Sequence, residues 1–230
     1  LTETDTDTDA DSDADGDTDA DTDADVDTAT GLGNTGDTAP PADPNPPTWT
    51  VDCNGGGDFA TIQAAIEAAT SGDRIGLAAC TYFERIDFIG KALEIYGIDG
   101  SAATIIDGAG DGTVVDVEVA ESLGTRLAGV TLTGGLDTEE GAVIELFDGV
   151  LELEDVVITG NGPAANLIHA FQGMLDLTNV TIEGNDVTGS AIYSKTGSLT
   201  VDHSTIDCSN GLQAIYHHNQ LILADSTVLC

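Results

Sequence analysis

Aromatic and titratable side chains recur at matching positions of four short segments in the second half of the chain. The segments are AVIELF (142–147), LIHAF (167–171), AIYSK (191–195) and AIYHH (214–218). Apolar and outward residues alternate in each, as in β-strands, so one isoleucine per segment is expected to point inward and its neighbours outward. If these strands stack in register, they form two outward columns: Glu145, His169, Tyr193, Tyr216 and Phe147, Phe171, Lys195, His218.

The two outward columns could carry two kinds of chemistry. Aromatic rings stack on sugar rings, and Lys or His can meet the carboxylates of acidic sugars, so these eight residues are predicted to form a glycan-binding face. Glu145 beside His169 could also exchange protons as an acid and a base. The alternative is ordinary strand composition, because aromatic residues favour strands and loops can cover Phe147 and Phe171.

A repeat of 22–26 residues would position these columns. Three copies are GVLELEDVVITGN (149–161), GMLDLTNVTIEGN (173–185) and GSLTVDHSTIDCSN (197–210), and NQLILADSTVLC (219–230) is a shorter fourth. Each copy alternates with period two and contains no helical segment, which favours a parallel β-solenoid. Extending the repeat back to Leu132 and Ile106 gives about six coils.

Stacking of the repeats also predicts the core and one corner of each coil. Two inward columns are expected: Leu151, Leu175, Leu199, Leu221 and Leu153, Leu177, Val201, Leu223. Asn and Asp tolerate a left-handed backbone, so a bend is predicted at the column Asp155, Asn179, His203, Asp225. We therefore predict that His203 is a turn residue and not a metal ligand.

The segment GGGDFATIQAAIEAATSGD (55–73) predicts a helix instead of a strand. Phe59, Ile62 and Ile66 follow helical spacing, and alanines fill many of the positions between them. Gly72 is expected to end this helix. Because the first coil of a solenoid has an unpaired edge and an open core, the helix is predicted to cap it.

The charge of the chain excludes several classes of protein. Its 230 residues include 42 acidic residues and five Lys and Arg, a formal net charge of −37. Such a surface repels phosphate backbones, which argues against nucleic-acid binding and against a basic membrane-surface helix. No apolar run approaches the roughly 18–20 residues of a membrane span. With aromatic residues at only 4%, any core must consist of aliphatic side chains.

Residues 1–48 differ in composition from the rest of the chain. Asp occupies every odd position from Asp5 to Asp27, and a proline-rich stretch follows. Like charges repel one another and few apolar side chains are present, so this segment is predicted to be a disordered stalk. Residues 49–230 are predicted to be the folded domain.

One string in the stalk resembles the start of a calcium loop. Asp11, Asp13 and Asp15 have the D-x-D-x-D-G spacing, but the closing position of such a loop holds Thr22. An alternating Asp tract produces this match easily, so the three residues are weak calcium candidates. Calcium is the one cofactor that the sequence suggests.

Four cysteines fall into two pairs. Cys208 and Cys230 occupy equivalent positions of consecutive coils, about 4.8 Å apart, which lies within disulfide range. Cys53 is expected in the strand before the cap helix and Cys80 in the strand after it, so they could also pair. Two disulfides would indicate an oxidising, extracytoplasmic location. Four buried free thiols are the alternative.

The segments GGGDFATIQAAIEAA, GDRIGLAACTYFERIDF, KALEIYGIDG and TIIDG follow one another between residues 55 and 108. In this arrangement the chain resembles right-handed parallel β-helix proteins of the pectin-lyase-like superfamily, pectin methylesterases in particular. The resemblance covers residues 49–230 and implies an all-β, right-handed parallel β-helix. For function it implies a range, from polysaccharide lyases, hydrolases and esterases to adhesins and inert stalks. The Asp/Thr-rich segment resembles the tethers of bacterial surface lipoproteins, which implies an extracellular or cell-surface location.

Enzymes of this superfamily combine paired Asp residues with an Arg that stabilises a developing anion. The sequence motifs that carry these residues in such enzymes are missing here. The sequence has no G-x-x-D-F-I-F-G string; the nearest, Asp87-Phe88-Ile89-Gly90, is predicted to be a strand and a turn. It also has no Asn-Thr-Asp, Asp-Asp or Arg-Ile-Lys string. Asp137, in a turn, is predicted to belong to a solvated acidic rim. The catalytic residues therefore stay unassigned.

Two functions remain. The first is a secreted or surface-displayed β-helix that binds glycans or serves as a structural, adhesin-like module, with a polysaccharide or the cell envelope as partner. The alternative is a polysaccharide-active enzyme, a pectate lyase or pectin esterase, whose catalytic coils are missing or unrecognised. The lack of a matching string favours the first. Because the last strand ends at Cys230 without a cap, we expect a continuation of the β-helix or a partner there.

Overall fold

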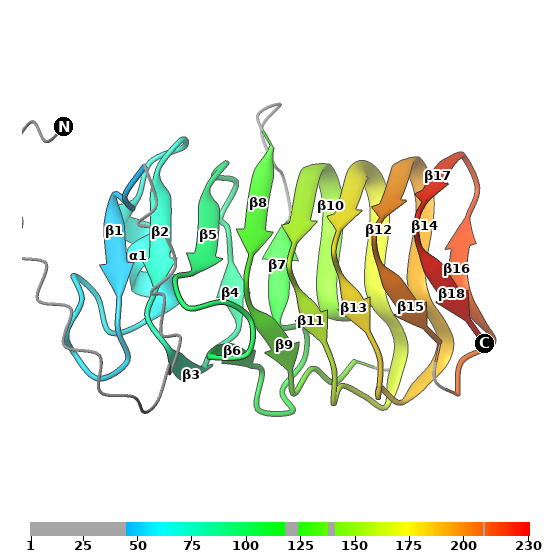
Figure 1. Cartoon of the computed structure of the whole chain (residues 1–230), viewed down its shortest axis with the longest axis horizontal. Coiled ribbons are helices and arrows are strands. Elements are labelled where there is room, and N and C mark those ends of the chain that lie inside the picture. The colour runs from blue at the N-terminus through cyan, green and yellow to red at the C-terminus, as the bar shows by residue number, and fades with distance from the viewer. Residues whose placement is uncertain (1–44, 118–123, 138–140, 209) are drawn as a thin grey trace, which may run out of the picture. The chain divides into compact units, whose positions relative to one another are not determined.

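The structure is a computed structural model that describes residues 45–117, 124–137, 141–208 and 210–230. Within these ranges, successive turns of the chain stack side by side as coils (Figure 1). The predicted stalk lies almost entirely outside the described residues, as do the calcium candidates Asp11, Asp13 and Asp15. Both stay predictions.

Strands and one short helix make up the regular structure of the described residues. Their bounds are β1 Trp49–Val51, α1 Ile62–Ala68, β2 Arg74–Leu77, β3 Cys80–Phe83, β4 Ile86–Asp87, β5 Glu94–Gly97, β6 Thr104–Asp107, β7 Val115–Val117, β8 Thr125–Ala128, β9 Thr131–Thr133, β10 Gly141–Glu154, β11 Val157–Ile158, β12 Ala164–Thr178, β13 Thr181–Ile182, β14 Val187–Asp202, β15 Thr205–Asp207, β16 Gln213–His217, β17 Gln220–Ala224 and β18 Thr227–Leu229.

The strands form two parallel sheets around one core. The first sheet has eleven strands along the order β1-β2-β5-β8-β10-β12-β14-β16, with β4, β7 and β17 paired beside this path. The second has seven strands in the order β18-β15-β13-β11-β9-β6-β3. A chain that returns parallel to itself, one strand further along in each turn, is a parallel β-helix, and such crossovers are right-handed. The predicted fold is confirmed.

In the described residues the β-helix has about seven coils, because the second sheet has seven strands. The sequence predicted about six. That prediction began at Ile106, but Ile106 of β6 pairs with Tyr82 of β3, which belongs to an earlier coil. The segment around Tyr82 shares little sequence with the later copies, so the repeat alone did not reveal this coil.

Glycine at one corner allows β10, β12 and β14 to run along two sides of each coil. Gly149, Gly173 and Gly197 are register partners in these three strands. A Cβ atom on Gly173 would lie 2.8 Å from the carbonyl oxygen of Gly149, so a larger residue has no room there. The strand segments before and after this corner therefore belong to different sides of the coil.

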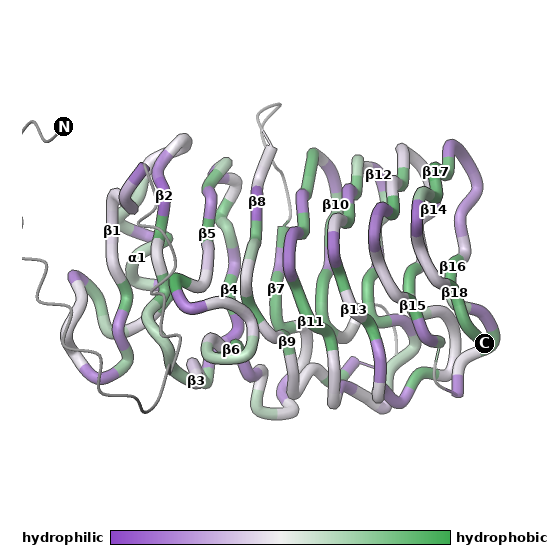
Figure 2. Tube along the Cα trace, in the orientation of Figure 1, coloured by the Kyte–Doolittle hydropathy of each residue, from purple (hydrophilic) through white to green (hydrophobic). Residues whose placement is uncertain are grey.

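The two predicted inward columns are confirmed by the strand register. Their members in β10, β12 and β14 are buried, whereas Leu221 and Leu223 of β17 are 40% and 50% exposed. Apolar and hydrophilic residues alternate along the coils (Figure 2). The core consists mainly of Val, Ile, Leu and Ala, as the scarcity of aromatic residues requires.

The predicted bend is confirmed at all four positions. Asp155, Asn179, His203 and Asp225 have φ angles of 54°, 54°, 49° and 44°, in the left-handed region. His203 is thus a turn residue, as predicted. Its Nδ1 atom lies 2.8 Å from Oδ1 of Asp202.

Two buried asparagines connect consecutive coils at another turn. Asn161 and Asn185 are only 3% and 5% exposed. Nδ2 of Asn161 donates to the Leu132 carbonyl at 3.1 Å and to Oδ1 of Asn185 at 3.0 Å, while its own Oδ1 accepts from Gly135 N at 2.8 Å. Nδ2 of Asn185 donates to the Ile158 carbonyl one coil earlier, at 2.9 Å. The carbonyls of Leu132 and Ile158 also accept from Thr159 N and Glu183 N, so these amides add side-chain hydrogen bonds between coils beside the backbone ladder.

The predicted helix is confirmed as α1, which buries Ile62, Ala65 and Ile66 against the first coils. It ends at Ala68 and does not reach Gly72. The chain leaves the helix at Ala69, whose φ and ψ angles of −69° and 163° are extended. The Lys91 ammonium satisfies the last carbonyls, donating to those of Ile66 and Glu67 at 2.8 and 2.9 Å. This seven-residue helix is the only one in the described ranges, and none there is long and apolar enough to cross a membrane.

A carboxylate from the next coil holds the start of α1. Glu84 accepts from the backbone N–H groups of Ile62 at 2.8 Å and Gln63 at 3.1 Å. Both N–H groups lie in the first turn of the helix, where no intrahelical acceptor exists, and a negative charge there also complements the helix dipole. Glu84 therefore links the cap to the solenoid.

Replacing Glu84 with alanine is expected to lower the free energy of unfolding by about 1–3 kcal/mol, because two charge-assisted hydrogen bonds are lost. Urea unfolding followed by circular dichroism measures this change. Glu67→Ala is the matched control, since Glu67 lies exposed on the same helix. Equal unfolding midpoints for the two variants would contradict the role of Glu84.

Both predicted disulfides are present. Cys53 pairs with Cys80 across 6.4 Å between Cα atoms, and Cys208 pairs with Cys230 across 5.3 Å. Cys53 lies in the turn after β1 and not in the strand itself, because β1 ends at Val51. The alternative of four free thiols is thereby excluded.

Candidate functional site

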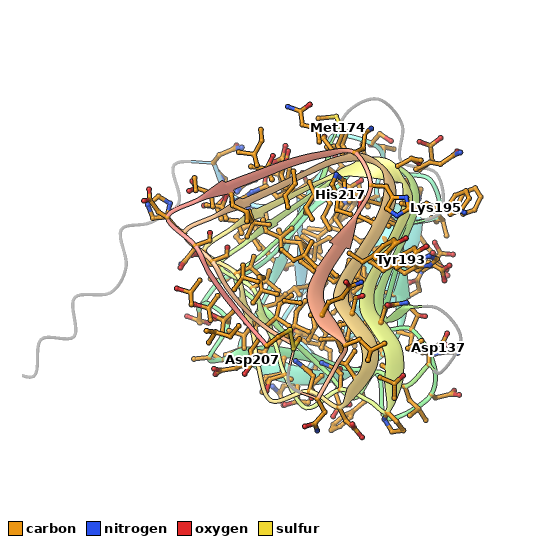
Figure 3. All side chains as sticks on the ribbon, turned by 90° about the vertical axis from the view of Figure 1, so that its right-hand side faces the viewer. Asp137, Met174, Tyr193, Lys195, Asp207 and His217 are labelled. Atoms are coloured by element: carbon orange, nitrogen blue, oxygen red, sulfur yellow. A yellow bond between two sulfur atoms is a disulfide. The ribbon has the colours of Figure 1, made fainter. Side chains whose placement is uncertain are left out.

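The first predicted outward column is assembled by the strand register. Glu145 of β10 pairs with His169 of β12, His169 with Tyr193 of β14, and Tyr193 with Tyr216 of β16. Viewed along the solenoid axis, Tyr193 and Lys195 lie on the same side of the coils, and Asp207 lies on another (Figure 3).

The rings of this column contact one another. The Tyr193 and Tyr216 rings are stacked, with centroids 4.7 Å apart and planes 3° from parallel. The His169 ring lies 5.2 Å from Tyr193. The ring of His218, which was predicted in the second column, lies 4.6 Å from Tyr216 and so contacts the first. The column therefore presents a continuous run of rings across three coils.

The second predicted column flanks the first. Phe147 and Phe171 are stacked with centroids 5.4 Å apart, and Nζ of Lys195 lies 4.8 Å from the Phe171 centroid. Phe147 is 51% exposed, so loops of the described residues do not cover it. The outcome is the predicted strip of aromatic side chains, exposed at Phe147 and partly buried at Phe171, Tyr193 and Tyr216. Whether it binds a glycan stays a prediction.

The first column continues into earlier coils, which the sequence did not indicate. Glu145 pairs with Asp116 of β7, and Asp116 pairs with Asp87 of β4. We call this side of the coils the column face. It is centred on six residues in register, Asp87, Asp116, Glu145, His169, Tyr193 and Tyr216.

The string around Asp87 was correctly predicted to be a strand and a turn. Asp87 ends β4, Phe88 is buried, and Ile89 and Gly90 have positive φ angles of 45° and 71°. The Asp87 carboxylate accepts from Ile89 N at 2.7 Å, which orients it. The sequence signal that could have placed Asp87 in the column is the alternation shared by IDF (86–88), VDV (115–117) and IEL (144–146).

A cavity of about 400 Å³ lies at the carboxylate end of the column face. Asp87, Asp116 and Asp137 line it together with Arg85 and Thr113. Asp137 therefore lies beside a cavity and is more than part of a solvated rim. Carboxylates can act as acid, base or nucleophile, and a guanidinium can stabilise a developing oxyanion, so the groups needed for hydrolytic chemistry are grouped here.

Glu145 and His169 adjoin the rings at the centre of the face. Oε1 of Glu145 lies 3.9 Å from Nδ1 of His169, and their side chains are 26% and 17% exposed. This separation is longer than a hydrogen bond. The pair can supply a donor and an acceptor to a bound hydroxyl group, and so serves binding more directly than proton transfer.

One group of side chains in the described residues has the composition of a metal site. Ligand atoms of Asp202, His203 and Asp225 lie within 4.8 Å of one another at the corner of the last coils. His203 and Asp225 are exposed, and His203 already lies close to Asp202. Nothing else at this corner points to a metal.

Charged side chains alternate across four coils on another side of the solenoid. Successive register partners are Arg74, Glu94, Arg126 and Glu152, which we call the charge ladder. Arg74 Nε donates to Glu94 at 2.7 Å, and the Arg126 guanidinium bridges Glu94 and Glu154. Burial alone would lower the pKa of Arg126, but its hydrogen bond to Glu154 and the negative charges of Glu154 and Glu94 raise it.

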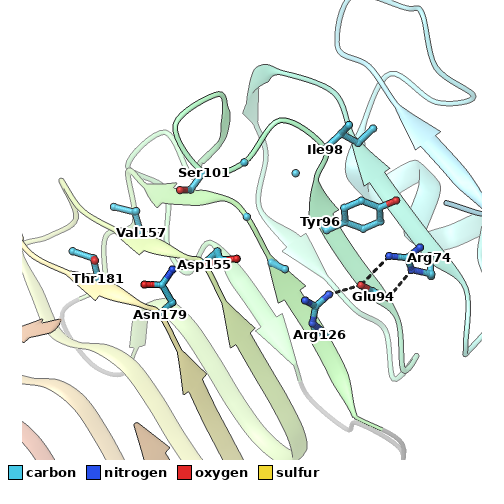
Figure 4. Close-up of a pocket in the computed structure, with 14 residues that line it drawn as sticks. Arg74, Glu94, Tyr96, Ile98, Ser101, Arg126, Asp155, Val157, Asn179 and Thr181 are labelled. Atoms are coloured by element: carbon cyan, nitrogen blue, oxygen red, sulfur yellow. Dashed lines mark hydrogen bonds and ion pairs between the residues drawn. The ribbon is translucent and has the colours of Figure 1, made fainter. Parts of the chain in front are cut away.

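The charge ladder borders a larger groove of about 590 Å³ (Figure 4). Tyr96 lies beneath the Arg74 guanidinium, 4.7 Å from its carbon atom, and Asp155 and Asn179 line the other side. Both arginines of the groove are engaged by glutamates. The column face, with open rings and clustered carboxylates, is the stronger candidate for a ligand site.

The coils and their register define the class of this protein as a right-handed parallel β-helix. Similar solved structures include a pectin methylesterase from carrot, with 15% identity, 79% of this chain and 83% of that chain covered, and a TM-score of 0.45. A pectin methylesterase in complex with a hexasaccharide has 13% identity, coverages of 74% and 82% and a TM-score of 0.40. The pectin methylesterase of Aspergillus niger has 13% identity, coverages of 80% and 86% and a TM-score of 0.37.

No protein-family model and no curated protein matches the chain. The roles of its residues therefore have to be argued from its own geometry.

Proposed function

We propose that the protein binds a linear polysaccharide along the column face. The observation that carries this proposal is the run of rings from His169 through Tyr193 to Tyr216, with centroids 5.2 and 4.7 Å apart. Tyrosine rings offer an apolar face to the C–H groups of a sugar and a hydroxyl group to its polar edge. Because coils repeat every ~4.8 Å, a chain lying along the axis meets similar partners at each step.

Residues beside the rings support the same ligand. Phe147 and Phe171 widen the apolar strip, and Phe147 is half exposed although no core requires it there. Glu145 and His169 supply polar atoms next to the rings. An apolar surface with a few placed polar groups is the usual composition of a carbohydrate or small-molecule site.

The location proposed for this protein is extracellular, on a bacterial cell surface or secreted. Two disulfides support an oxidising compartment. The acidic segment over residues 1–48 would then act as a stalk that carries the β-helix away from the surface.

Changing Tyr193 and Tyr216 together to alanine is expected to weaken glycan binding at least 30-fold, which corresponds to about 2 kcal/mol. Affinity electrophoresis in gels that contain the polysaccharides retarding the parent protein measures the loss. The residues belong to strands with intact register partners, so the circular dichroism spectrum should stay unchanged.

Phe83→Ala is the matched control, because Phe83 is an exposed aromatic residue, at 71%, on the second sheet. Its retention should equal that of the parent protein. Unchanged retention of the Tyr193→Ala/Tyr216→Ala variant would rule out binding at the column face.

A second candidate function is hydrolysis of glycosidic or ester bonds in the bound polysaccharide. It is favoured by the cavity in which Asp87, Asp116, Asp137 and Arg85 come together. Asp87 and Asp116 are register partners on adjacent strands and line the same cavity, so both carboxylates could act on one bound group. The two functions are compatible, since the rings would hold the chain while the carboxylate end acts on it.

A further inference from the structure

We infer that the column face selects uncharged polysaccharides and excludes polyuronates; this inference rests on the polysaccharide binding proposed above. Its starting point is the order of residues along the face. Asp87, Asp116 and Glu145 occupy three consecutive register positions, directly followed by His169 and the two tyrosines. A chain that follows the rings along the axis therefore runs onto a row of carboxylates.

Further carboxylates border this row. Asp137 lines the cavity beside Asp87 and Asp116, and Asp148 is exposed next to Phe147. A uronate carboxylate placed in this region would lie within a few ångströms of several like charges. Like charges at such distances repel even through water.

Cations on the face are few, and each has a neighbour. Of the five Lys and Arg of the chain, all of which the structure describes, Arg85 and Lys195 lie on this face. Arg85 is paired with Asp111 at 3.7 Å, and Lys195 lies over the Phe171 ring. Two cations against at least four carboxylates leave the face negative.

The rest of the folded domain adds to this local charge. Residues 51–230 hold 27 of the 42 acidic residues against five Lys and Arg. A polyuronate approaching such a domain is repelled over a Debye length, about 8 Å at physiological ionic strength.

An uncharged sugar is not repelled by the carboxylates of the column face and can form hydrogen bonds with them. Its hydroxyl groups are hydrogen-bond donors, and the carboxylates of Asp116 and Glu145 are strong acceptors for them. Its ring faces pack on Tyr193 and Tyr216. The same residues that repel a uronate thus bind a neutral chain.

Isothermal titration calorimetry of the full chain tests the inference. The ligands are neutral hexasaccharides of glucose, mannose, xylose and galactose and hexasaccharides of galacturonate and mannuronate, at low salt with EDTA to remove bridging cations. The tightest neutral ligand is expected to bind at least tenfold more tightly than either uronate. A uronate that binds as tightly as the best neutral ligand would overturn the inference and leave the proposed function standing.

Matched double variants test the cause of the selectivity. Asp116→Asn/Glu145→Gln removes two charges from the face, keeps acceptor oxygens, and is expected to reduce the neutral-to-uronate ratio at least fivefold by strengthening uronate binding. Asp176→Asn/Glu183→Gln removes two charges elsewhere and should change the ratio less than twofold.

Equal changes of the ratio in the two double variants would also overturn the inference, because selectivity would then follow net charge and not the column face. If no hexasaccharide of either kind binds, the proposed function fails and the inference fails with it.

Discussion

Replacing Asn161 with alanine is expected to lower the free energy of unfolding by about 2–4 kcal/mol. The side chain is 3% exposed and is the hydrogen-bond partner of Gly135 N, the Leu132 carbonyl and the Asn185 side chain. Alanine would leave Gly135 N without its acceptor, at about 1–3 kcal/mol, whereas the Leu132 carbonyl keeps its bond from Thr159 N and the Asn185 amide keeps its bonds to the carbonyls of Ile158 and Glu183. The smaller side chain would also leave space in a buried turn.

Urea unfolding followed by circular dichroism measures the effect of Asn161→Ala. Asn219→Ala is the control, because Asn219 is exposed between β16 and β17, and its midpoint should match that of the parent protein. A loss below about 1 kcal/mol for Asn161→Ala would show that water replaces the amide.

On a polysaccharide that the protein hydrolyses, Asp116→Asn is expected to lower turnover about 10²–10⁴-fold. Asp116 lines the cavity and lies between Asp87 and Glu145 in the column, so it adjoins both the carboxylate pair and the binding rings. Asparagine preserves its size and one acceptor oxygen but cannot take or give a proton. Retention on the same polysaccharide should change only severalfold.

Turnover is measured as new reducing ends for glycosidic bonds, or as the alcohol or acid released for ester bonds. Asp99→Asn is the control, because Asp99 is exposed and lies outside the cavity lining. If Asp116→Asn hydrolyses as fast as the parent protein, the proposed role of Asp116 is wrong. If the parent hydrolyses no polysaccharide, the second candidate function is wrong and binding alone remains.

Parallel stacking explains why the later coils could be predicted so fully from the sequence. Equivalent residues of consecutive coils share one environment, so Leu151, Leu175 and Leu199 repeat as a buried type every 24 residues. The same regularity predicted the outward rings of Tyr193 and Tyr216. What those rings bind is a property of a ligand outside the chain, and stays a prediction.

The carboxylate end of the face was not predicted because its spacing differs from that of the later coils. Asp87, Asp116 and Glu145 are 29 residues apart, whereas Glu145, His169 and Tyr193 are 24 apart. The extra residues form turns and loops, which change the repeat length without changing the strand register. A search for fixed strings also fails there, since the cavity is assembled from residues of different coils.

Contacts with residues distant in the sequence account for the remaining differences between the predictions and the structure. The end of α1 was predicted from Gly72, but the helix ends at Ala68, where Lys91 of the next coil donates to its last carbonyls. The roles of Asn161 and Asn185 likewise depend on carbonyl groups one coil away. Local sequence indicates which element forms, and contacts between coils decide where it stops.

The charge ladder has a consequence for how the chain avoids misfolding. In a solenoid of similar repeats, a strand could pair with the second coil along and skip the adjacent one, since an aliphatic column such as Ile144, Ile168 and Ile192 fits either way. The alternating charges of Arg74, Glu94 and Arg126 disfavour such a skipped pairing. A skipped coil would bring Arg74 beside Arg126, and the alternation of charge thereby distinguishes the native order of the first coils from its out-of-register competitors.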